Sequence, residues 1–279
     1  MAQYPAFSVS MCVYGGDDST FFDAALESVV QQTVPPSEIV LTVDGPIPTA
    51  TETVIQKYRD ALPALGIAFP VVYLERNMGH GEARRICFEH CRHDLIALMD
   101  ADDLSVPERF QKQLACFASD PALAIVGGNM QEFIGTPDHP VGKRLVPQLD
   151  ADIKRYMQRR CPMNQVTVMF RKTAVIQAGG YLDWYCDEDY YLWIRMALIG
   201  CKFGNVPDIL VNVRVGAEMY SRRGGWKYFK SEARLQQLML RKRMIGPGRY
   251  GINVAQRLVL QVLMPNNLRS WLFQKLARS

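Results

Sequence analysis

Short, mainly apolar runs alternate with stretches of helical periodicity through the first half of the chain. Each run is four to seven residues long, and the helical stretches between them hold ten to twelve residues. Continuous apolar runs of this length, separated by helices, are typical of a parallel sheet covered on both faces. The pattern therefore predicts an α/β fold with a doubly wound, mostly parallel sheet. The expected strands are 7–13, 38–43, 71–74, 95–99 and 123–126, and the expected helices are 21–31, 51–62, 82–91 and 108–117.

The second half of the chain has a different rhythm. Strands are expected at 165–170, 202–206 and 209–215, and helices from Lys172 and over 188–199, with a turn at Gly179-Gly180 between them. After Gly225 the pattern is helical and basic to the end, interrupted at 246–248 and at Pro265. We therefore expect a smaller subregion beside the sheet, followed by a basic helical extension.

Charge is distributed unevenly along the chain. The net charge is +4 at pH 7, yet no acidic residue follows Glu232, whereas nine lysines and arginines do, so the residues up to Glu232 together carry −5. A basic tail on an acidic body favours an anionic partner surface, and phospholipid or a lipid pyrophosphate fits as well as nucleic acid does. A solvated basic helix without a partner is the alternative.

Composition and terminal segments bear on the compartment. The chain has 279 residues, of which 48% are hydrophobic, and its seven cysteines are scattered without a CxxC pair, which favours a reducing compartment. Residues 1–7 lack the pattern of a signal peptide, and the apolar run 258–264 is far shorter than the roughly 20 residues that span a bilayer. Leucines and aromatic residues among the C-terminal arginines resemble an interfacial helix pair broken by Pro265, or a pair packed on the rest of the protein. We expect a cytoplasmic protein in peripheral contact with the inner face of the cytoplasmic membrane.

An acidic segment, Asp100-Ala101-Asp102-Asp103, follows the apolar run 95–99. Three carboxylates so close to a buried strand need a cation, and Mg²⁺ or Mn²⁺ is satisfied by one or two carboxylates plus water and phosphate oxygens. The alternative is that these aspartates only cap the next helix, because Ser105 to Glu108 reads as a capping box. Asp44 and Asn77 also follow predicted strands, and ligands of open α/β sheets bind beyond such ends. One crevice therefore gathers all of these side chains.

Five motifs in order resemble glycosyltransferase family 2, whose members share the GT-A fold. The resemblance covers roughly residues 7–215 and is more specific than any one motif. It implies a catalytic domain over 1–215, with a nucleotide-sugar half at about 1–128 and an acceptor half at 129–215, and an extension over 216–279. The motifs are Ser8 to Tyr14 with Ser28 to Thr33, Val43-Asp44-Gly45, Arg76 to Gly79 with Ala83-Arg84, Asp100 to Asp103, and Asp187 to Arg195.

The resemblance implies a donor site for a UDP-sugar. Tyr14 and Asp44 would hold the base, although they also read as a boundary tyrosine and a turn aspartate. Asn77 and Arg84 would reach the ribose or diphosphate, with Gly79 allowing close approach, unless Arg84 simply faces solvent.

The resemblance also assigns the metal and the base. Asp100 would bind the ribose or the metal, and Asp102 would ligate the metal, Mn²⁺ or Mg²⁺, at the diphosphate. Asp103 would lie behind them or cap a helix. Asp189, beside Glu188, would be the general base of an inverting transfer, although both also read as favourable charges at a helix start.

The sequence departs from many relatives near Arg214. A histidine that often ligates the metal is missing, since Gly216 stands at its position, which leaves water, Glu218 or a weaker metal requirement. Further on, Arg222 and Arg223 resemble a subgroup that builds bacterial exopolysaccharide, capsule and O-antigen (lipopolysaccharide) repeats. They would grip the pyrophosphate of a polyprenyl-diphosphate-linked saccharide acceptor, or form a basic turn without a ligand. The resemblance implies membrane contact and no nucleic acid.

Two other functions use similar residues. A sugar-phosphate nucleotidyltransferase also needs metal-bound carboxylates, but no glycine-rich basic loop follows the N-terminus. A non-catalytic nucleotide-sugar or lipid-binding protein is the second. The run Cys87 to His93 does not indicate zinc, because its cysteines fall on an apolar helix face and its histidines do not.

Overall fold

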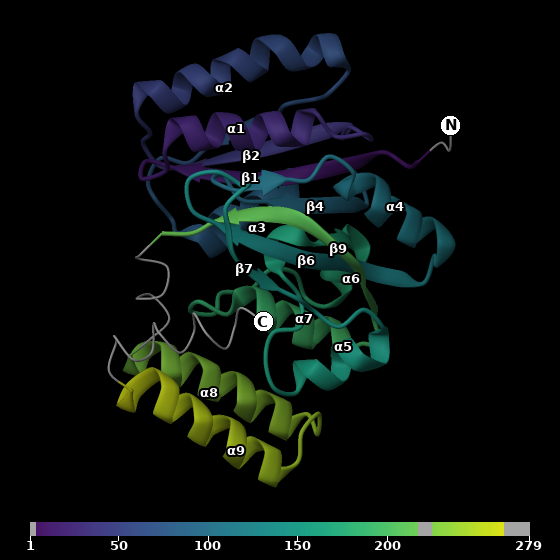
Figure 1. Ribbon diagram of the computed structural model, residues 1–279, viewed down its shortest axis with the longest axis vertical. Helices are drawn as coiled ribbons and strands as arrows, with labels where there is room; N and C mark the ends of the chain where they lie inside the picture. Colours follow the sequence, from purple (N-terminus) through teal and green to yellow (C-terminus); the bar gives the residue numbers. More distant parts are fainter. Residues whose placement is uncertain (1–3, 217–224, 265–279) are drawn as a thin grey trace.

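The computed structural model describes residues 4–216 and 225–264 (Figure 1). The first half folds as alternating strands and helices, as expected. Its strands are β1 (Phe7–Tyr14), β2 (Glu38–Asp44), β3 (Val71–Tyr73), β4 (Leu95–Met99) and β5 (Leu104–Ser105). Its helices are α1 (Ser19–Val30), α2 (Thr49–Ala61), α3 (His80–His90) and α4 (Arg109–Ser119), with a 3₁₀ turn at Leu62–Leu65.

The second half adds long strands and the C-terminal helices. Its strands are β6 (Leu123–Phe133), β7 (Pro140–Arg144), β8 (Met169–Arg171) and β9 (Lys202–Arg214). Its helices are α5 (Asp150–Met157), α6 (Lys172–Gln177), α7 (Glu188–Leu198), α8 (Trp226–Arg241) and α9 (Pro247–Leu258), with a 3₁₀ turn at Gln165–Thr167 and a π turn at Val259–Leu263.

In the described ranges all strands form one sheet, in the order β3-β2-β1-β4-β8-β6-β9-β5, with β7 on β6. The part β3-β2-β1-β4 is parallel, so the carboxyl ends of these four strands share one edge. β8 is antiparallel to both of its neighbours, while β6 and β9 are parallel. The α/β fold is confirmed, and the sheet becomes mixed in its second half.

Three local predictions were wrong. The two strands expected at 202–206 and 209–215 are one strand, because Pro207 and Asp208 bulge out opposite Gly128 and Asn129, whose side chain donates to the Pro207 carbonyl at 2.6 Å. The strand expected at 165–170 begins as a 3₁₀ turn.

The third wrong prediction is the capping box. Ser105 lies in β5, where its hydroxyl accepts a bond from Gln32 at 3.1 Å, and α4 begins only at Arg109 without a side-chain cap. The acidic residues therefore do not cap α4.

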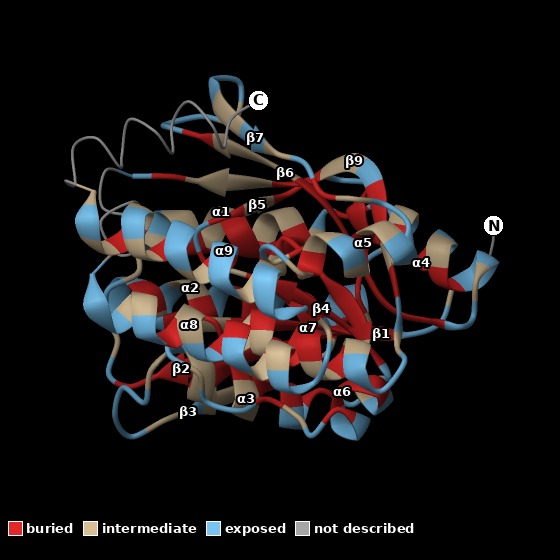
Figure 2. Cartoon of the chain, turned by 90° about the horizontal axis from the view of Figure 1, so that it is seen from below, coloured by how far each residue is buried: buried red, intermediate tan, exposed pale blue. Residues whose placement is uncertain are grey.

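Two hydrophobic cores lie on the two faces of the sheet. One packs α1, α2 and α4 against alternate residues of the strands, such as Met11 and Val13 of β1. The other packs α3, α5, α6 and α7 on the opposite face, and α8 adds Leu235 and Met239 to it. In Figure 2, which views the molecule through its helices, the central strands β1 and β4 are coloured as buried. The described helices thus cover both faces of the sheet, and ligands of open α/β sheets bind beyond the carboxyl edge.

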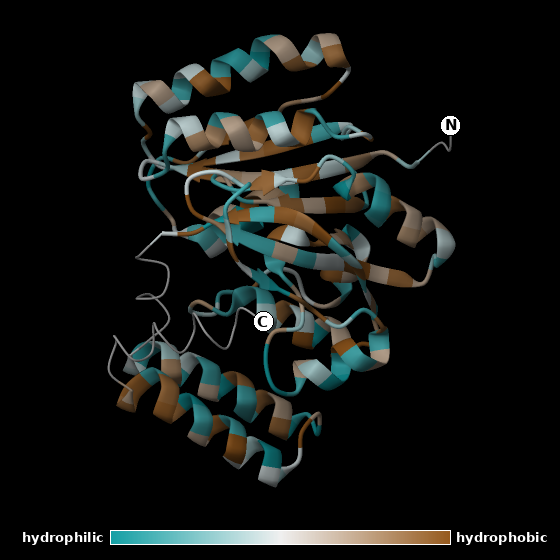
Figure 3. Cartoon of the chain, in the orientation of Figure 1, coloured by the Kyte–Doolittle hydropathy of each residue, from teal (hydrophilic) through white to brown (hydrophobic). Residues whose placement is uncertain are grey.

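Helices α8 and α9 form a separate layer beyond α5 and α7 (Figure 1). They pack against each other and alternate hydrophobic and hydrophilic residues along their length (Figure 3). No helix within 4–216 or 225–264 is long and apolar enough to cross a membrane. The segment after Pro265, which the sequence predicts to be the second half of an interfacial pair, lies outside the described residues.

Candidate active site

Tyr14 and Asp44 end neighbouring parallel strands, and their Cα atoms pair in the β1–β2 register. Tyr14 is 42% exposed, and its ring covers Gly16, where a Cβ atom would lie 2.6 Å from the ring. Gly45 has φ +85°, and a Cβ atom there would lie 2.5 Å from the backbone nitrogen of Asn77. The two residues predicted to hold the base therefore lie side by side at the carboxyl edge of the sheet.

The carboxylate of Asp44 organises the loop before α3. It is buried and accepts backbone N–H bonds from Met78 at 2.6 Å and Gly79 at 3.0 Å. Gly79 has φ +89°, and its N–H also reaches the Asn77 side chain at 3.1 Å. A carboxylate accepts about four bonds, so Asp44 keeps acceptor capacity for a ligand. Gly79 is thus needed for its backbone conformation, and its N–H is already hydrogen-bonded to the side chains of Asp44 and Asn77.

Arg84 lies in the interior, which rules out the solvent-facing alternative. It is 3% exposed, and its Nη2 donates to Oδ1 of Asp100 at 2.7 Å. Burial lowers the pKa of Arg84, but the nearby charges of Asp100, Tyr181 and Glu188 outweigh it and raise the value. In the described part of the chain its Nη1 has no acceptor. The helix α3 thus delivers a permanent cation to the acidic turn.

Asp102 and Asp103 differ sharply in exposure. Asp102 is exposed, whereas Asp103 is 3% exposed and accepts the backbone N–H of Arg214 at 2.8 Å. Burial, then Asp100 and Asp102, raise the pKa of Asp103 well above its usual range. The Arg214 guanidinium donates to the Asp102 carbonyl at 3.2 Å and stacks on Phe21. Asp103 therefore anchors the turn to β9.

A third arginine lies beneath the turn. Arg109 is fully buried and donates to the Leu98 carbonyl at 2.7 Å. Burial lowers its pKa to about 9, while Asp100 and Asp103 act in the opposite sense. Arg84 and Arg109 therefore offset part of the negative charge of the acidic turn, for which the sequence alone suggests a metal ion. Asp102 and part of the Asp100 side chain remain exposed to solvent.

Two further residues of this region, Asp17 and Tyr181, are not predicted from the sequence. Asp17, in the turn after β1, accepts the Tyr14 N–H at 3.0 Å, and burial, then Asp102 and Asp100, raise its pKa to about 6. Asp17 lies beside the acidic turn because β1 and β4 are neighbours in the sheet. No single sequence motif predicts this position. Tyr181 is 5% exposed, and its hydroxyl is buried without a partner in the described residues. Burial raises the pKa of Tyr181, and Arg84 opposes this rise.

The motif with the predicted base starts α7. Glu188 lies against α3, 4.0 Å from the position of a Gly81 Cβ atom, and burial and Asp189 raise the pKa of Glu188. The Oδ2 atom of Asp189 lies 4.0 Å from the thiol of the half-buried Cys161. Arg84 acts on the pKa of Glu188, so α3 links the acidic turn to the start of α7. All of the predicted donor and base residues lie in this one region.

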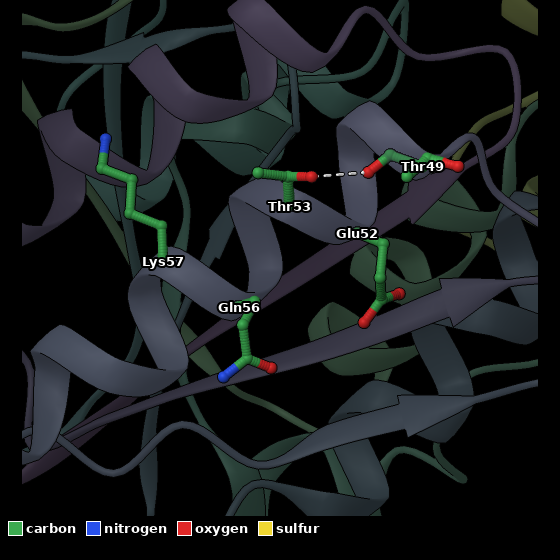
Figure 4. Close-up of a pocket in the computed structure, with 5 residues that line it drawn as sticks. All are labelled: Thr49, Glu52, Thr53, Gln56 and Lys57. Atoms are coloured by element: carbon green, nitrogen blue, oxygen red, sulfur yellow. Dashed lines mark hydrogen bonds between the residues drawn. The ribbon is translucent and has the colours of Figure 1, made fainter.

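Arg222 and Arg223, predicted to grip the acceptor pyrophosphate, fall outside the described residues. Cys87 and Cys91 are buried as predicted, and the described ranges contain no group of three or more histidine, cysteine or acidic side chains suited to hold a metal. A shallow hollow on α2 contains no predicted site residue (Figure 4). It is lined by Thr49, Glu52, Thr53, Gln56 and Lys57.

Comparison with known proteins identifies the family. The model of glycosyl transferase family 2 matches residues 8–179, which is more than half of the chain. The chain belongs to this family. It is 35% identical to an amylovoran biosynthesis glycosyltransferase of Erwinia amylovora, over 96% of this chain and 98% of the relative. It is 32% identical to the UDP-Gal:α-D-GlcNAc-diphosphoundecaprenol β-1,3-galactosyltransferase of Escherichia coli, over 98% of this chain and 97% of the relative.

Solved structures confirm the family fold. S. aureus TarS in complex with UDP-GlcNAc superposes with a TM-score of 0.66 at 16% identity, covering 91% of this chain and 73% of the other. The mannosyltransferase from Pyrobaculum calidifontis in complex with GDP-Man and Mn²⁺ gives 0.64 at 15% identity, covering 96% and 72%. The predicted GT-A type α/β fold is confirmed, and the chain is a glycosyltransferase.

Proposed function

We propose that this family 2 member is an inverting, metal-dependent glycosyltransferase that moves a hexose or N-acetylhexosamine from a UDP-sugar to a lipid-linked saccharide. The observation that carries the proposal is the position of Arg84, which pairs with Asp100 and acts on Glu188. One buried cation thus joins the predicted diphosphate site to Glu188, the residue before the predicted base Asp189. We also propose that the chain consists of a catalytic domain at 1–215 and an extension at 216–279.

The donor set of the acidic turn fits Mn²⁺ or Mg²⁺. Asp102 is exposed and the Asp100 side chain is 31% exposed, so both can offer oxygen, the ligand that these ions prefer. Asp103 is buried and bonds the Arg214 backbone, so we propose the two more exposed carboxylates of the turn as the ligands. A metal bound here would stabilise negative charge on the departing nucleoside diphosphate. Removing it with EDTA and restoring it with Mn²⁺ tests this part of the proposal.

Side chains of the protein bind the donor and activate the acceptor. Tyr14 stacks on the base and Asp44 accepts a base N–H, while Asn77 and Arg84 hold the ribose and diphosphate. Asp189 takes the proton from the acceptor hydroxyl as that oxygen attacks the anomeric carbon opposite the diphosphate, which inverts the centre. Glu188 adds a second carboxylate on the same turn of α7.

The acceptor and the location follow from relatives and from charge. The Escherichia coli relative is named for a diphosphoundecaprenol-linked acceptor, and the Erwinia amylovora relative for amylovoran synthesis. Helices α8 and α9 carry one acidic residue, Glu232, which pairs with Arg257. Their basic residues suit the anionic inner face of the cytoplasmic membrane, where the protein would act in surface polysaccharide synthesis without nucleic acid.

A donor screen tests the reaction class. Purified protein is incubated with a bacterial membrane extract, Mn²⁺ and a panel of UDP-sugars, and nucleotide release is measured. We expect UDP release with one donor. Release of pyrophosphate from a nucleoside triphosphate would instead indicate a nucleotidyltransferase, and UDP binding without turnover would indicate a binding protein.

A further inference from the structure

The loop before α7 presents an exposed aromatic residue close to the predicted base. Tyr185 is 43% exposed and precedes Asp189 by four residues, which limits the chain between them to about 14 Å. Between the two lies Cys186, a non-glycine residue with φ +59°. Such a conformation is costly for a side chain with a Cβ atom and is concentrated at functional sites. The loop therefore keeps a specific shape just before the turn of α7 that carries the predicted base.

A lysine from the C-terminal helices lies on this aromatic ring. The Nζ atom of Lys227 is 3.9 Å from the centroid of Tyr185, a cation–π geometry. Lys227 is exposed and lies in the first turn of α8, which holds no acidic residue. In the described part of the chain it forms no ion pair, and Glu232 on the next turn is paired with Arg257. The positive charge of Lys227 is available to an anion.

The pair is held by bonds between the loop and α8. The Ser231 hydroxyl donates to the Tyr185 carbonyl at 2.6 Å, and the Trp184 indole donates to the Ser231 carbonyl at 3.3 Å. Trp184 also packs on Tyr191 of α7, with ring centroids 4.3 Å apart. The loop, α8 and α7 thus form one assembly. Any group bound at Lys227 is positioned relative to the start of α7, which carries Asp189.

The geometry points to Lys227 and Tyr185 as the binding site for the diphosphate and the first sugar of a lipid-diphosphate-linked acceptor. The inference rests on the proposed function and names a subsite of the same reaction. In the acceptor of the Escherichia coli relative, the diphosphate is attached to the sugar that receives galactose. An anion site must then lie close to the base, and Lys227 lies on the ring of Tyr185, four residues before Asp189. The Tyr185 ring would pack on the sugar while Lys227 turns to the phosphates.

Calorimetry with farnesyl diphosphate tests the anion subsite. We expect Lys227→Gln to weaken binding by roughly tenfold, or about 1.4 kcal/mol. Lys242→Gln is the matched control, because Lys242 is exposed and follows the same helix about 22 Å away. Farnesyl monophosphate and inorganic pyrophosphate distinguish recognition of a lipid diphosphate from recognition of a free anion. Equal binding by wild type and Lys227→Gln, or no binding by wild type, would overturn the assignment.

A second probe, farnesyl-diphosphate-linked N-acetylglucosamine, tests the aromatic subsite. We expect Tyr185→Leu to weaken binding of this probe several-fold and to leave farnesyl diphosphate and UDP binding unchanged. Equal affinity of Tyr185→Leu and wild type for the probe would remove Tyr185 from the site. UDP release in the donor screen is measured on the same preparations. If the enzyme releases UDP but the variants bind both probes as wild type does, this inference is refuted and the proposed function is not.

Discussion

The Nη2 atom of Arg84 lies 2.7 Å from Oδ1 of Asp100, and the two side chains differ in exposure, 4% for the arginine and 31% for the aspartate. The cation is interior and the carboxylate faces outward. Loss of Asp100 therefore leaves a buried charge without its partner, whereas the exposed Asp102 can be changed without that cost.

This difference separates the two proposed metal ligands experimentally. We expect Asp100→Asn to lower the free energy of unfolding by about 2 kcal/mol, less than for a fully buried pair, with a fall in Tm of roughly 5 °C. Asp102→Asn should change stability by less than about 0.5 kcal/mol. Both variants should lose Mn²⁺-dependent UDP release. Thermal unfolding and the release assay check this, and equal Tm losses would contradict the account of Arg84.

Asp189 is the proposed base. Because positioned proton transfer contributes about 10²- to 10⁴-fold, Asp189→Asn should lower kcat by that order and leave the Kd of UDP unchanged. Glu188→Gln is the matched comparison on the same helical turn, and we expect a smaller fall in kcat. Steady-state kinetics with calorimetry of UDP checks both. Full activity of Asp189→Asn would place the base elsewhere.

The parts of the site that sequence predicts are those at strand ends. Tyr14, Asp44 and Asp100 follow apolar runs, and parallel strands bring their ends to one edge, so their proximity follows from the α/β pattern. The order of the strands is not encoded locally. Asp17 lies beside the acidic turn only because β1 and β4 pair, and nothing in its own segment predicts that contact.

The sequence also does not predict which side chains are buried or which distant residues they contact. Arg84 and Arg85 look alike in sequence, yet Arg84 is buried against Asp100 and Arg85 pairs with Glu82 and Glu89 on the surface of α3. Ser105 has the spacing of a helix cap, but pairing of β5 with β9 directs it to Gln32 instead. In each case a tertiary contact decided between two locally reasonable conformations.

Gly45 provides a test of the donor loop. Its φ of +85° costs a residue with a Cβ atom roughly 1–2 kcal/mol, and a Cβ atom would also lie 2.5 Å from the Asn77 nitrogen. Gly66 is the control, with φ +72° and no atom within 4 Å. We expect Gly66→Ala to cost about 1 kcal/mol, and Gly45→Ala to cost about 2 kcal/mol more and to raise the KM for the donor. Denaturant unfolding and kinetics measure both, and identical effects would show that the loop does not press on Gly45.

Asp187 predicts how stability depends on pH. Burial, then Glu232, raise its pKa from 3.8 to about 8, and its Oδ2 is buried without a partner in the described residues. Between about pH 4 and pH 8 Asp187 keeps a proton in the folded protein that it has lost in the unfolded chain. Its contribution to the free energy of unfolding is therefore fully present below about pH 4 and is lost as the pH rises toward 8. Asp187→Asn stays neutral throughout. We expect its Tm to exceed that of wild type by a margin that widens from pH 5 to pH 8.5, while the exposed Asp183→Asn shows no such trend. A margin independent of pH would mean that Asp187 is already ionised in the folded protein.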